Sequence, residues 1–315
     1  MFLLGVTVLS TTACGWNAEE PASAPRPPVV RVVHSWGDDT TYTEIIQTAL
    51  TKSLKNVRVH MSGTNASVTN VFMLRRGEAE AVFTFSDAAY MASVGQIPGM
   101  PQPFEEIRAI AGLPTRAVQI VINPQSRIRS VPELRGAHVS LGPPGSGAAL
   151  TSAFVLSAFG ISLQDLNAER LEFREGARKV IAGGLDAAFW NGSFPNANIA
   201  EAMRHGARLL EVTGPDVERF RVEYPFLKPS VIPAGTYPGM DRPVHTVGVD
   251  GILVCRASLD ESVVHELTRA FFEMVSRTDL GVRPLNRMNL SQASSTAIPL
   301  HPGAARYYRE RELLR

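Results

Sequence analysis

Cysteine is scarce in this 315-residue sequence, which has Cys14 near its start and Cys255 far along the chain. Cys14 falls where an export signal is removed or lipidated, so Cys255 has no partner and no structural disulfide is expected. We interpret Cys255 as a small buried hydrophobic residue, because no His or Asn is arranged near it in the sequence as a nucleophile would need.

Excess charge is also missing, since 31 Lys and Arg residues stand against 30 Asp and Glu residues. No basic face shows in the sequence, which excludes nucleic acid as a partner. With 44% hydrophobic and 19% charged residues, the composition is that of a folded soluble protein.

Metal-ligand spacing is absent as well. The histidines have neither the i, i+3 or i, i+4 spacing of helical ligands nor a paired cysteine motif beside them. Carboxylates form no acid/base pair, since Glu105-Glu106 and the stretch from Glu218 to Glu223 are typical of solvated surface. We therefore expect no metal, no cofactor and no catalytic residue. The histidines are His34, His60, His138, His205, His245, His265 and His301.

Residues 1–14 are typical of a bacterial export signal. Phe2 to Leu9 is an apolar run too short to cross a membrane, which takes about 20 residues, but it matches the core of a signal peptide. Ala13-Cys14 resembles a lipoprotein signal in which the cysteine is lipidated, and plain cleavage is the alternative. The protein is expected in the periplasm or at the outer face of the cell envelope.

After a flexible tether over 15–28, short apolar runs alternate with helix-length segments. This alternation predicts an α/β fold with a mainly parallel sheet covered by helices on both faces. In such a sheet, ligands bind beyond the carboxyl ends of the strands. The first strand-helix units are Val29–His34 with Thr43–Lys55, Val57–Met61 with Val68–Arg76, and Ala81–Phe85 with Asp87–Val94.

The length favours two lobes, because single cores stop growing near about 250–300 residues. Two long apolar strands, Ala117–Ile122 and His245–Val254, are the natural crossings between them. Lobe 1 would then be discontinuous, over 29–117 and 246–315, and lobe 2 would span 118–245. A proline-rich stretch from Pro225 to Pro243 interrupts the strand-helix pattern.

The turn Gly142-Pro143-Pro144-Gly145-Ser146-Gly147 is the strongest local indication of a binding site. It joins a buried strand to a helix, where free backbone N–H groups and the helix dipole favour an anion. It is not a phosphate-binding P-loop, since Ala148-Ala149 follow the last glycine. The alternative is a tight turn with a helix cap.

Three other strand-to-helix turns carry small polar residues at the same edge of the sheet. Capping of the following helix is the default interpretation of each. Together they predict a polar pocket that holds a carboxylate on backbone donors. The turns are 36–42, 62–67 with Thr64, Asn65 and Ser67, and Ser86-Asp87.

With these motifs in hand, the chain resembles the TAXI-type solute receptors of tripartite ATP-independent periplasmic (TRAP) transporters. The matching stretches run through nearly the whole mature chain. They are Ser62-Gly63-Thr64 with Ser67 and Asn70; Gly77-Glu78-Ala79-Glu80 with Ser86-Asp87; Gly142–Gly147; Asp186-Ala187-Ala188-Phe189 with Gly192 and Pro195; Ile232-Pro233 and Gly235–Gly239; and Ile298–Ala304 with Arg306-Tyr307-Tyr308 and Glu310.

The resemblance implies a two-lobed type II periplasmic-binding-protein fold, each lobe a mixed, mainly parallel sheet flanked by helices. It implies a monomeric receptor that closes on a small organic anion, such as glutamate or 2-oxoglutarate, and delivers it to a TRAP permease. The His301–Tyr308 motif is interpreted as a structural lock of the C-terminal segment onto lobe 1. The ligand-binding positions carried over are Gly37, Tyr42, Thr64, Ser67, Ser86, Gly145, Ser146, Gly147, Phe189 and Tyr237.

Departures from the family pattern bear on the ligand. Asp38-Asp39 stand in the first turn, where the family is usually glycine-rich. One hypothesis is that Asp38 meets an amine on the ligand, and the alternative is that both aspartates face water and cap the helix. Phe85 and Trp190 suggest an aromatic-lined pocket. Two other functions stay open: a binding module for an envelope sensor, and an envelope hydrolase that uses Ser146.

Overall fold

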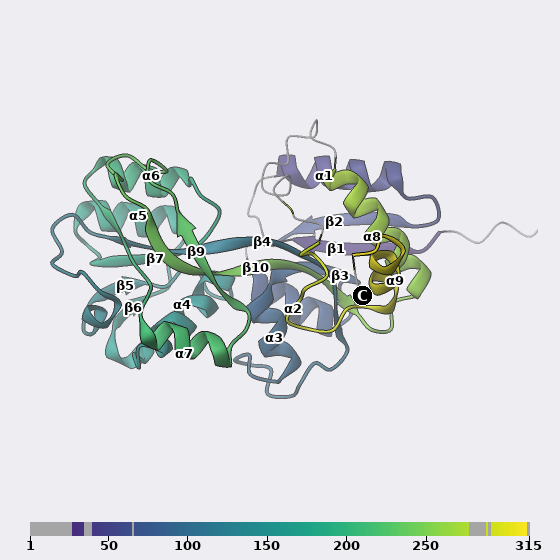
Figure 1. Ribbon diagram of the computed structural model, residues 1–315, viewed down its shortest axis with the longest axis horizontal. Coiled ribbons are helices and arrows are strands. Elements are labelled where there is room, and N and C mark those ends of the chain that lie inside the picture. The colour runs from purple at the N-terminus through teal and green to yellow at the C-terminus, as the bar shows by residue number, and fades with distance from the viewer. Residues whose placement is uncertain (1–26, 35–39, 65, 277–287, 289–290, 314–315) are drawn as a thin grey trace, which may run out of the picture.

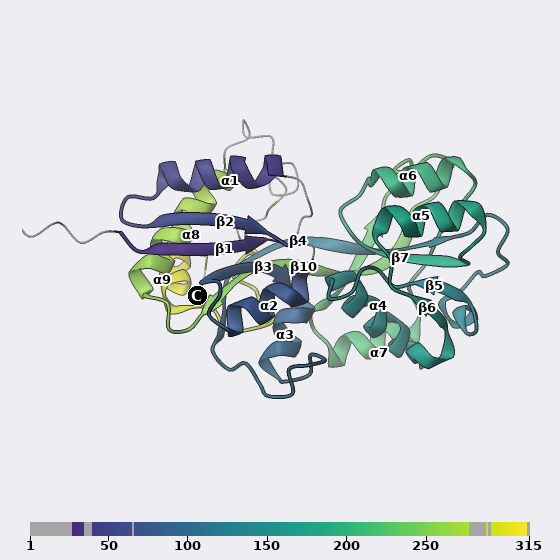
Figure 2. The same ribbon diagram turned by 180° about the vertical axis from the view of Figure 1, so that it is seen from behind.

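The computed structural model describes residues 27–34, 40–64, 66–276, 288 and 291–313, and the chain forms two lobes joined by two long strands (Figures 1 and 2). The connecting strands are β4 (Ile107–Ile122) and β10 (Val244–Arg256), which pair with each other in antiparallel fashion. They sit in the middle of one sheet of order β2-β1-β3-β10-β4-β7-β5-β6. Both predicted crossings therefore lie on these strands, although β4 begins at Ile107, well before Ala117.

Lobe 1 is built on the parallel strands β1 (Val29–His34), β2 (Arg58–Gly63) and β3 (Ala81–Phe85). Val, Met and Phe side chains on these strands are buried, and they lie on both faces, as expected for a covered parallel sheet. The helices of this lobe are α1 (Thr40–Ser53), α2 (Ser67–Arg75), α3 (Ser86–Ser93), α8 (Glu261–Val275) and α9 (Pro302–Glu310).

Lobe 2 continues the sheet on the other side of β4. Its strands are β5 (His138–Ser140), β6 (Asn167–Glu169), β7 (Ala187–Gly192), β8 (Arg208–Leu210) and β9 (Leu227–Ile232). Its helices are α4 (Gly147–Ala158), α5 (Phe173–Ala182), α6 (Ala197–Arg204) and α7 (Pro215–Glu223), with 3-10 turns at Val131–Leu134 and Leu163–Asp165. Strand β9 lies inside the proline-rich stretch, and Pro229 is tolerated there because β9 pairs with β10 alone.

The C-terminal segment is fastened to lobe 1. The backbone N–H of His301 donates to the carbonyl of Ala109 on β4 at 2.8 Å, and the Tyr308 hydroxyl donates to the carbonyl of Ile110 at 2.9 Å. A side chain at Gly303 would overlap the backbone of Glu261, so α9 packs directly on the start of α8. These bonds hold the segment where the resemblance expected a structural lock.

Three hydrophobic clusters fill the molecule. One lies on the α2, α3 and α4 side of the sheet and takes residues from both lobes, while the other two lie under α1 and α8 and under α5 and α6. Cys255 is completely buried in the cluster under α1 and α8, and this burial raises the pKa of its thiol.

Within the part of the chain that the structure describes, no helix is long and apolar enough to cross a membrane. The boundaries 29–117, 118–245 and 246–315 remain a prediction.

Candidate functional site

Helix starts from the two lobes meet below the connecting strands in Figure 1. Gly147 begins α4 in lobe 2, and a methyl group added there would overlap the ring of Phe85 and lie 3.1 Å from Ser67 Oγ, both in lobe 1. The N–H of Val68 in α2 donates to the carbonyl of Gly145 at 3.1 Å. The structure therefore brings together five predicted site residues: Ser67, Phe85, Gly145, Ser146 and Gly147.

Two hydroxyls in these turns are used locally. Ser146 Oγ accepts from the N–H of Ala149 at 3.1 Å and donates to the carbonyl of Pro143 at 2.7 Å, so it is the N-cap of α4. Thr64 Oγ1 hydrogen-bonds to Asn70 Oδ1 and accepts from the N–H of Ala66 at 3.3 Å. Capping, the alternative for the Gly142–Gly147 turn, accounts for Ser146. In the 62–67 turn, where capping was the default interpretation, α2 has no side-chain cap and Thr64 bonds locally instead.

A buried polar chain crosses from one lobe to the other at the same place. Thr151 of α4 donates to Asp87 Oδ2 of α3 at 2.5 Å, and its Oγ1 also lies 2.8 Å from the carbonyl of Gly147. Asn191 of β7 donates from Nδ2 to Thr151 Oγ1 at 2.9 Å. Complete burial raises the pKa of Asp87 to about 6. A carboxyl group that has no cationic partner in the described part of the chain is thus enclosed between the lobes.

Two polar atoms in this region are buried without a hydrogen-bond partner among the described residues. They are Ser86 Oγ, at the first residue of α3, and Asn191 Oδ1. A buried acceptor that lacks a donor costs about 1–3 kcal/mol, so such atoms commonly meet a ligand or an ordered water. Ser86 was predicted to bind ligand, whereas Asn191 was not.

Arg116 is the cation of this region, and it was missed in the sequence. It lies on β4 between the lobes, opposite Val249 of β10, and its guanidinium donates to Ser193 Oγ just after β7. Burial lowers the pKa of Arg116, which nevertheless stays charged. Among the described residues, no carboxylate contributes to this pKa or forms an ion pair with Arg116. Arg116 belongs to no motif that sequence reasoning could have used, and its strand carries a second arginine, Arg108.

The Arg116 contact lies close to the helix starts. Ser193 and Asn191, which contact Arg116 and Thr151 respectively, are two residues apart at the end of β7, so their backbones lie about 7 Å apart. Thr151 lies one helical turn from Gly147. An anion that reached Arg116 would therefore also be near the positive end of α4.

The other predicted aromatic residues separate onto two faces of β7. Trp190 is buried against Phe173, with ring centroids 4.5 Å apart, in the cluster that also holds Tyr237. Phe189 lies in the core cluster on the opposite face, because neighbouring residues of a strand point to opposite sides. Phe189 and Trp190 therefore do not line one pocket together.

Tyr237 is buried and anchors the turn that follows β7. Its hydroxyl donates to Gln119 Oε1 at 2.5 Å and accepts from the N–H of Asn196 at 3.1 Å. Burial raises the pKa of Tyr237 to about 12, so the phenol is neutral. Tyr237 is thus held on the face opposite the Phe189 cluster.

Several predicted residues lie outside the described part of the chain. These are Gly37, Asp38, Asn65 and Cys14, and the side chain of Tyr42 is not described either, although its backbone belongs to α1. Their roles stay predictions. In the described residues, no group of three or more His, Cys, Asp and Glu side chains could hold a metal ion.

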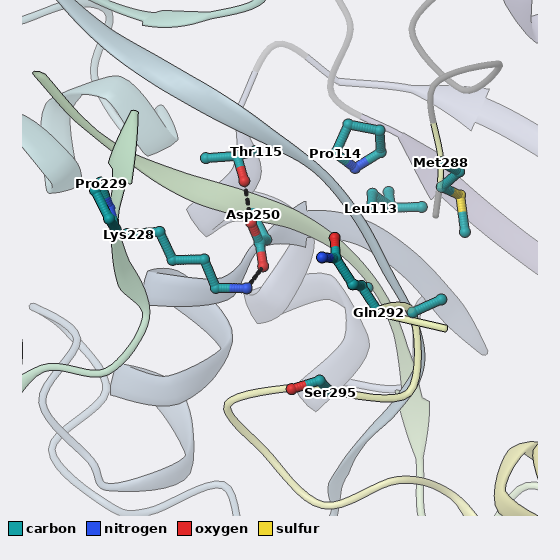
Figure 3. Close-up of a pocket in the computed structure, with 11 residues that line it drawn as sticks. Leu113, Pro114, Thr115, Lys228, Pro229, Asp250, Met288, Gln292 and Ser295 are labelled. Carbon is teal, nitrogen blue, oxygen red and sulfur yellow. Dashed lines mark hydrogen bonds and ion pairs between the residues drawn. The ribbon is translucent and has the colours of Figure 1, made fainter. Parts of the chain in front are cut away.

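A cavity of about 490 Å³ lies over the connecting strands. In Figure 3, Asp250 of β10 lies between Thr115 and Lys228 of β9; it accepts from the Thr115 hydroxyl at 2.6 Å and pairs with Lys228. Gln292 and Ser295 border it from lobe 1. A second cavity of about 280 Å³ shares Lys228, Asp250 and Ser295 and reaches Ser86. We call the two together the hinge cavity.

A family model described as the NMT1-like family matches residues 41–311. The periplasmic aliphatic sulphonate binding protein SsuA from Escherichia coli has a similar structure at 13% identity, with a TM-score of 0.52 over 90% of this chain and 83% of that one. The alkanesulfonate-binding protein SsuA from Xanthomonas axonopodis pv. citri, bound to MOPS, is 15% identical, with a TM-score of 0.53 over 93% of this chain and 96% of that one. PhnD1 from Prochlorococcus marinus, in complex with methylphosphonate, is 14% identical, with a TM-score of 0.52 over 90% of this chain and 96% of that one. These likenesses confirm the predicted periplasmic-binding-protein fold.

Proposed function

The chain belongs to the NMT1-like family, and from that premise we propose that it is an extracytoplasmic solute receptor that closes its two lobes on a small organic anion. The fold supports this proposal, because two lobes joined by a pair of strands can hinge around a ligand. The proposal includes the location of the protein. Residues 1–14 would direct its export, and a lipidated Cys14 would anchor it to the membrane.

Arg116 is the observation that carries the proposal. A charged guanidinium that is partly buried and lacks a carboxylate partner among the described residues is costly unless an anion completes it. Its planar fork binds carboxylate, sulfonate or phosphonate oxygens in pairs. The nearby start of α4 adds backbone donors of the first helical turn.

Asn191 and Ser86 refine the ligand class. Asn191 Oδ1 can only accept, and Ser86 Oγ can accept or donate. A ligand that carries a hydroxyl or amine donor besides its acid group would satisfy both the cation and the unpaired oxygens. L-Glutamate and 2-oxoglutarate follow from the TAXI resemblance, and sulfonates and phosphonates follow from the ligands of the similar structures. The amine hypothesis for Asp38 belongs to the same proposal.

Isothermal titration calorimetry with L-glutamate, 2-oxoglutarate, ethanesulfonate and methylphosphonate tests the proposal. We expect at least one of these anions to bind, and Arg116→Met to weaken that binding about 100-fold, since it removes charge-assisted bonds. Arg309→Met, an exposed arginine on α9, is the matched control and should bind as the wild type does. Binding unchanged in Arg116→Met would contradict the proposed site, and unchanged binding in Asp38→Asn would remove the amine hypothesis.

The partner is proposed to be a TRAP permease, on the strength of the TAXI resemblance alone. Uptake driven by an ion gradient would support that assignment. Uptake driven by ATP would contradict the TRAP permease but not the proposal that the receptor binds a solute. A histidine kinase encoded next to the receptor would favour the sensor alternative. The hydrolase alternative has little support, because both hydrogen-bonding roles of Ser146 are occupied in the cap of α4.

A further inference from the structure

Asp87 is a carboxyl group enclosed by both lobes. It lies in the first turn of α3 in lobe 1 and is 0% exposed. Its Oδ2 atom meets the Thr151 hydroxyl of lobe 2, and its Oδ1 atom accepts from the N–H of Ala88 at 2.7 Å. Asn191 of lobe 2 closes the chain behind Thr151. Every hydrogen-bond partner of Asp87 in the described residues is therefore neutral.

Charged groups do not compensate Asp87 from the surrounding elements. Burial is the largest cause of its raised pKa, the hydrogen bonds from Thr151 and Ala88 oppose it, and no charged residue contributes. Helix α4 and strand β3 carry no titratable side chain. The titratable residues on the other elements packed against α3 are Arg75 on α2, Arg108 and Arg116 on β4, and His245, Asp250, Cys255 and Arg256 on β10, with Tyr90 on α3 itself.

Closure of the lobes is what buries this carboxyl group. Thr151 and Asn191 belong to lobe 2, so separation of the lobes would break the Asp87–Thr151 bond and admit water to the start of α3. In water, a carboxylate without charged neighbours returns toward its ordinary pKa. The closed state thus holds a proton on Asp87 at pH values where the open state does not.

We infer that lobe closure takes up a proton at Asp87, so that the receptor closes more readily in acid. The inference rests on the proposed function in one respect, namely that the lobes open and close around a ligand. When Asp87 is protonated, its hydroxyl donates to Thr151 Oγ1, and the Thr151 hydroxyl turns to the carbonyl of Gly147, which already lies 2.8 Å away. The proton comes from solvent, and no charge is left in the closed contact.

The size of the effect follows from linkage. A group that binds its proton more tightly in the closed state favours that state progressively as the pH falls through its closed-state pKa. Between pH 7.5 and pH 5.0, the ratio of closed to open receptor should rise roughly tenfold.

Spin-label distances measured by double electron–electron resonance, without any ligand, test the inference. Labels at Lys52→Cys on α1 and Arg174→Cys on α5, both exposed, report the separation of the lobes in the full chain with Cys14→Ser. Cys255 is completely buried and can be retained. We expect the short-distance population to gain roughly tenfold over the long-distance population between pH 7.5 and pH 5.0.

Asp87→Asn separates a proton effect from a general effect of acid. The amide has the shape of a protonated carboxyl group, so this variant should show the same, mainly closed population at both pH values. Asp241→Asn, at an exposed position, is the matched control and should keep the wild-type response. A wild-type ratio that does not change with pH, or a response that persists in Asp87→Asn, overturns the inference. Because no anion is added, a negative result here does not contradict anion binding at Arg116. A negative result in the calorimetry of Arg116→Met likewise does not contradict proton uptake at Asp87.

Discussion

The two regions where the lobes meet differ in chemistry. Below the connecting strands lies what we call the aromatic contact, where Tyr90 of α3 meets Phe226 with ring centroids 5.5 Å apart and Phe226 meets Phe154 of α4 at 5.4 Å. The larger part of the hinge cavity, in contrast, is mainly polar and holds the Asp250–Lys228 pair, while its smaller part reaches Phe226. Buried aromatic surface stabilises far more than a half-exposed ion pair does. The aromatic contact should therefore fix the closed arrangement, while the hinge cavity tolerates change.

The largest effect is expected at the centre of the aromatic contact. Phe226 is 1% exposed, so Phe226→Ala should lower the free energy of unfolding by about 3–5 kcal/mol, because it leaves a cavity between the lobes. Val222→Ala, at a side chain 86% exposed on α7, is the control and should stay within about 0.5 kcal/mol. Urea unfolding measures both. A loss below about 1 kcal/mol for Phe226→Ala would mean that the contact is not packed as described.

The next effect concerns pH and Asp87. Its pKa is about 6 in the folded protein against an ordinary value of 3.8 for an aspartate, so the folded state binds the proton more tightly. The stability contribution is therefore full below about pH 4 and is lost as the pH rises to about 6, by up to about 3 kcal/mol. In Asp87→Asn, this part of the pH dependence should vanish from urea-unfolding curves. If the free energy of unfolding changed by the same amount over this pH window in the wild type and in Asp87→Asn, that result would contradict the assignment.

Gly147 offers a smaller and more local way to disturb the same region. Gly147→Ala places a methyl group against the Phe85 ring, which should cost about 1–3 kcal/mol and hold the lobes apart. Small-angle scattering should then show a larger radius of gyration. Gly184→Ala has only ordinary contacts, the nearest at 3.7 Å, and should leave the radius unchanged. Equal radii in the two variants would show that the lobes absorb the methyl group without separating.

The smallest effect is expected in the hinge cavity. Lys228 is 43% exposed, so its pair with Asp250 should contribute no more than about 1 kcal/mol, and Asp250 keeps its bond from Thr115 in Lys228→Met. Thermal unfolding at low and high salt measures this contribution. A loss above about 2 kcal/mol would reverse the comparison and make the ion pair a determinant of lobe position.

Sequence periodicity predicted much of the fold. Alternating Val-rich runs and helix-length segments predicted β1 to β3 and their helices. Strand β9 and helix α7 were not predicted, because the prolines around them weaken the local pattern. Their positions are set by tertiary contacts, namely the pairing of β9 with β10 and the packing of Phe220 on Phe154.

The candidate site was predicted less completely. Turn chemistry located Ser67 and Gly147, which meet at the helix starts, and it located Ser86 at the first residue of α3. Asp87 and Thr151 are 64 residues apart, and the contact between them depends on how the lobes dock, so local spacing holds no sign of it. The sequence likewise gives no indication of Arg116, because its importance comes from the absence of a nearby carboxylate in the described structure.

A crystal structure of the receptor with the anion that binds most tightly in the calorimetric panel tests the central claim most directly. The account predicts the acid group of that anion within hydrogen-bond distance of the Arg116 guanidinium and of backbone N–H groups at the start of α4. Density for the anion in the hinge cavity beside Lys228, with Arg116 left unbound, would contradict it.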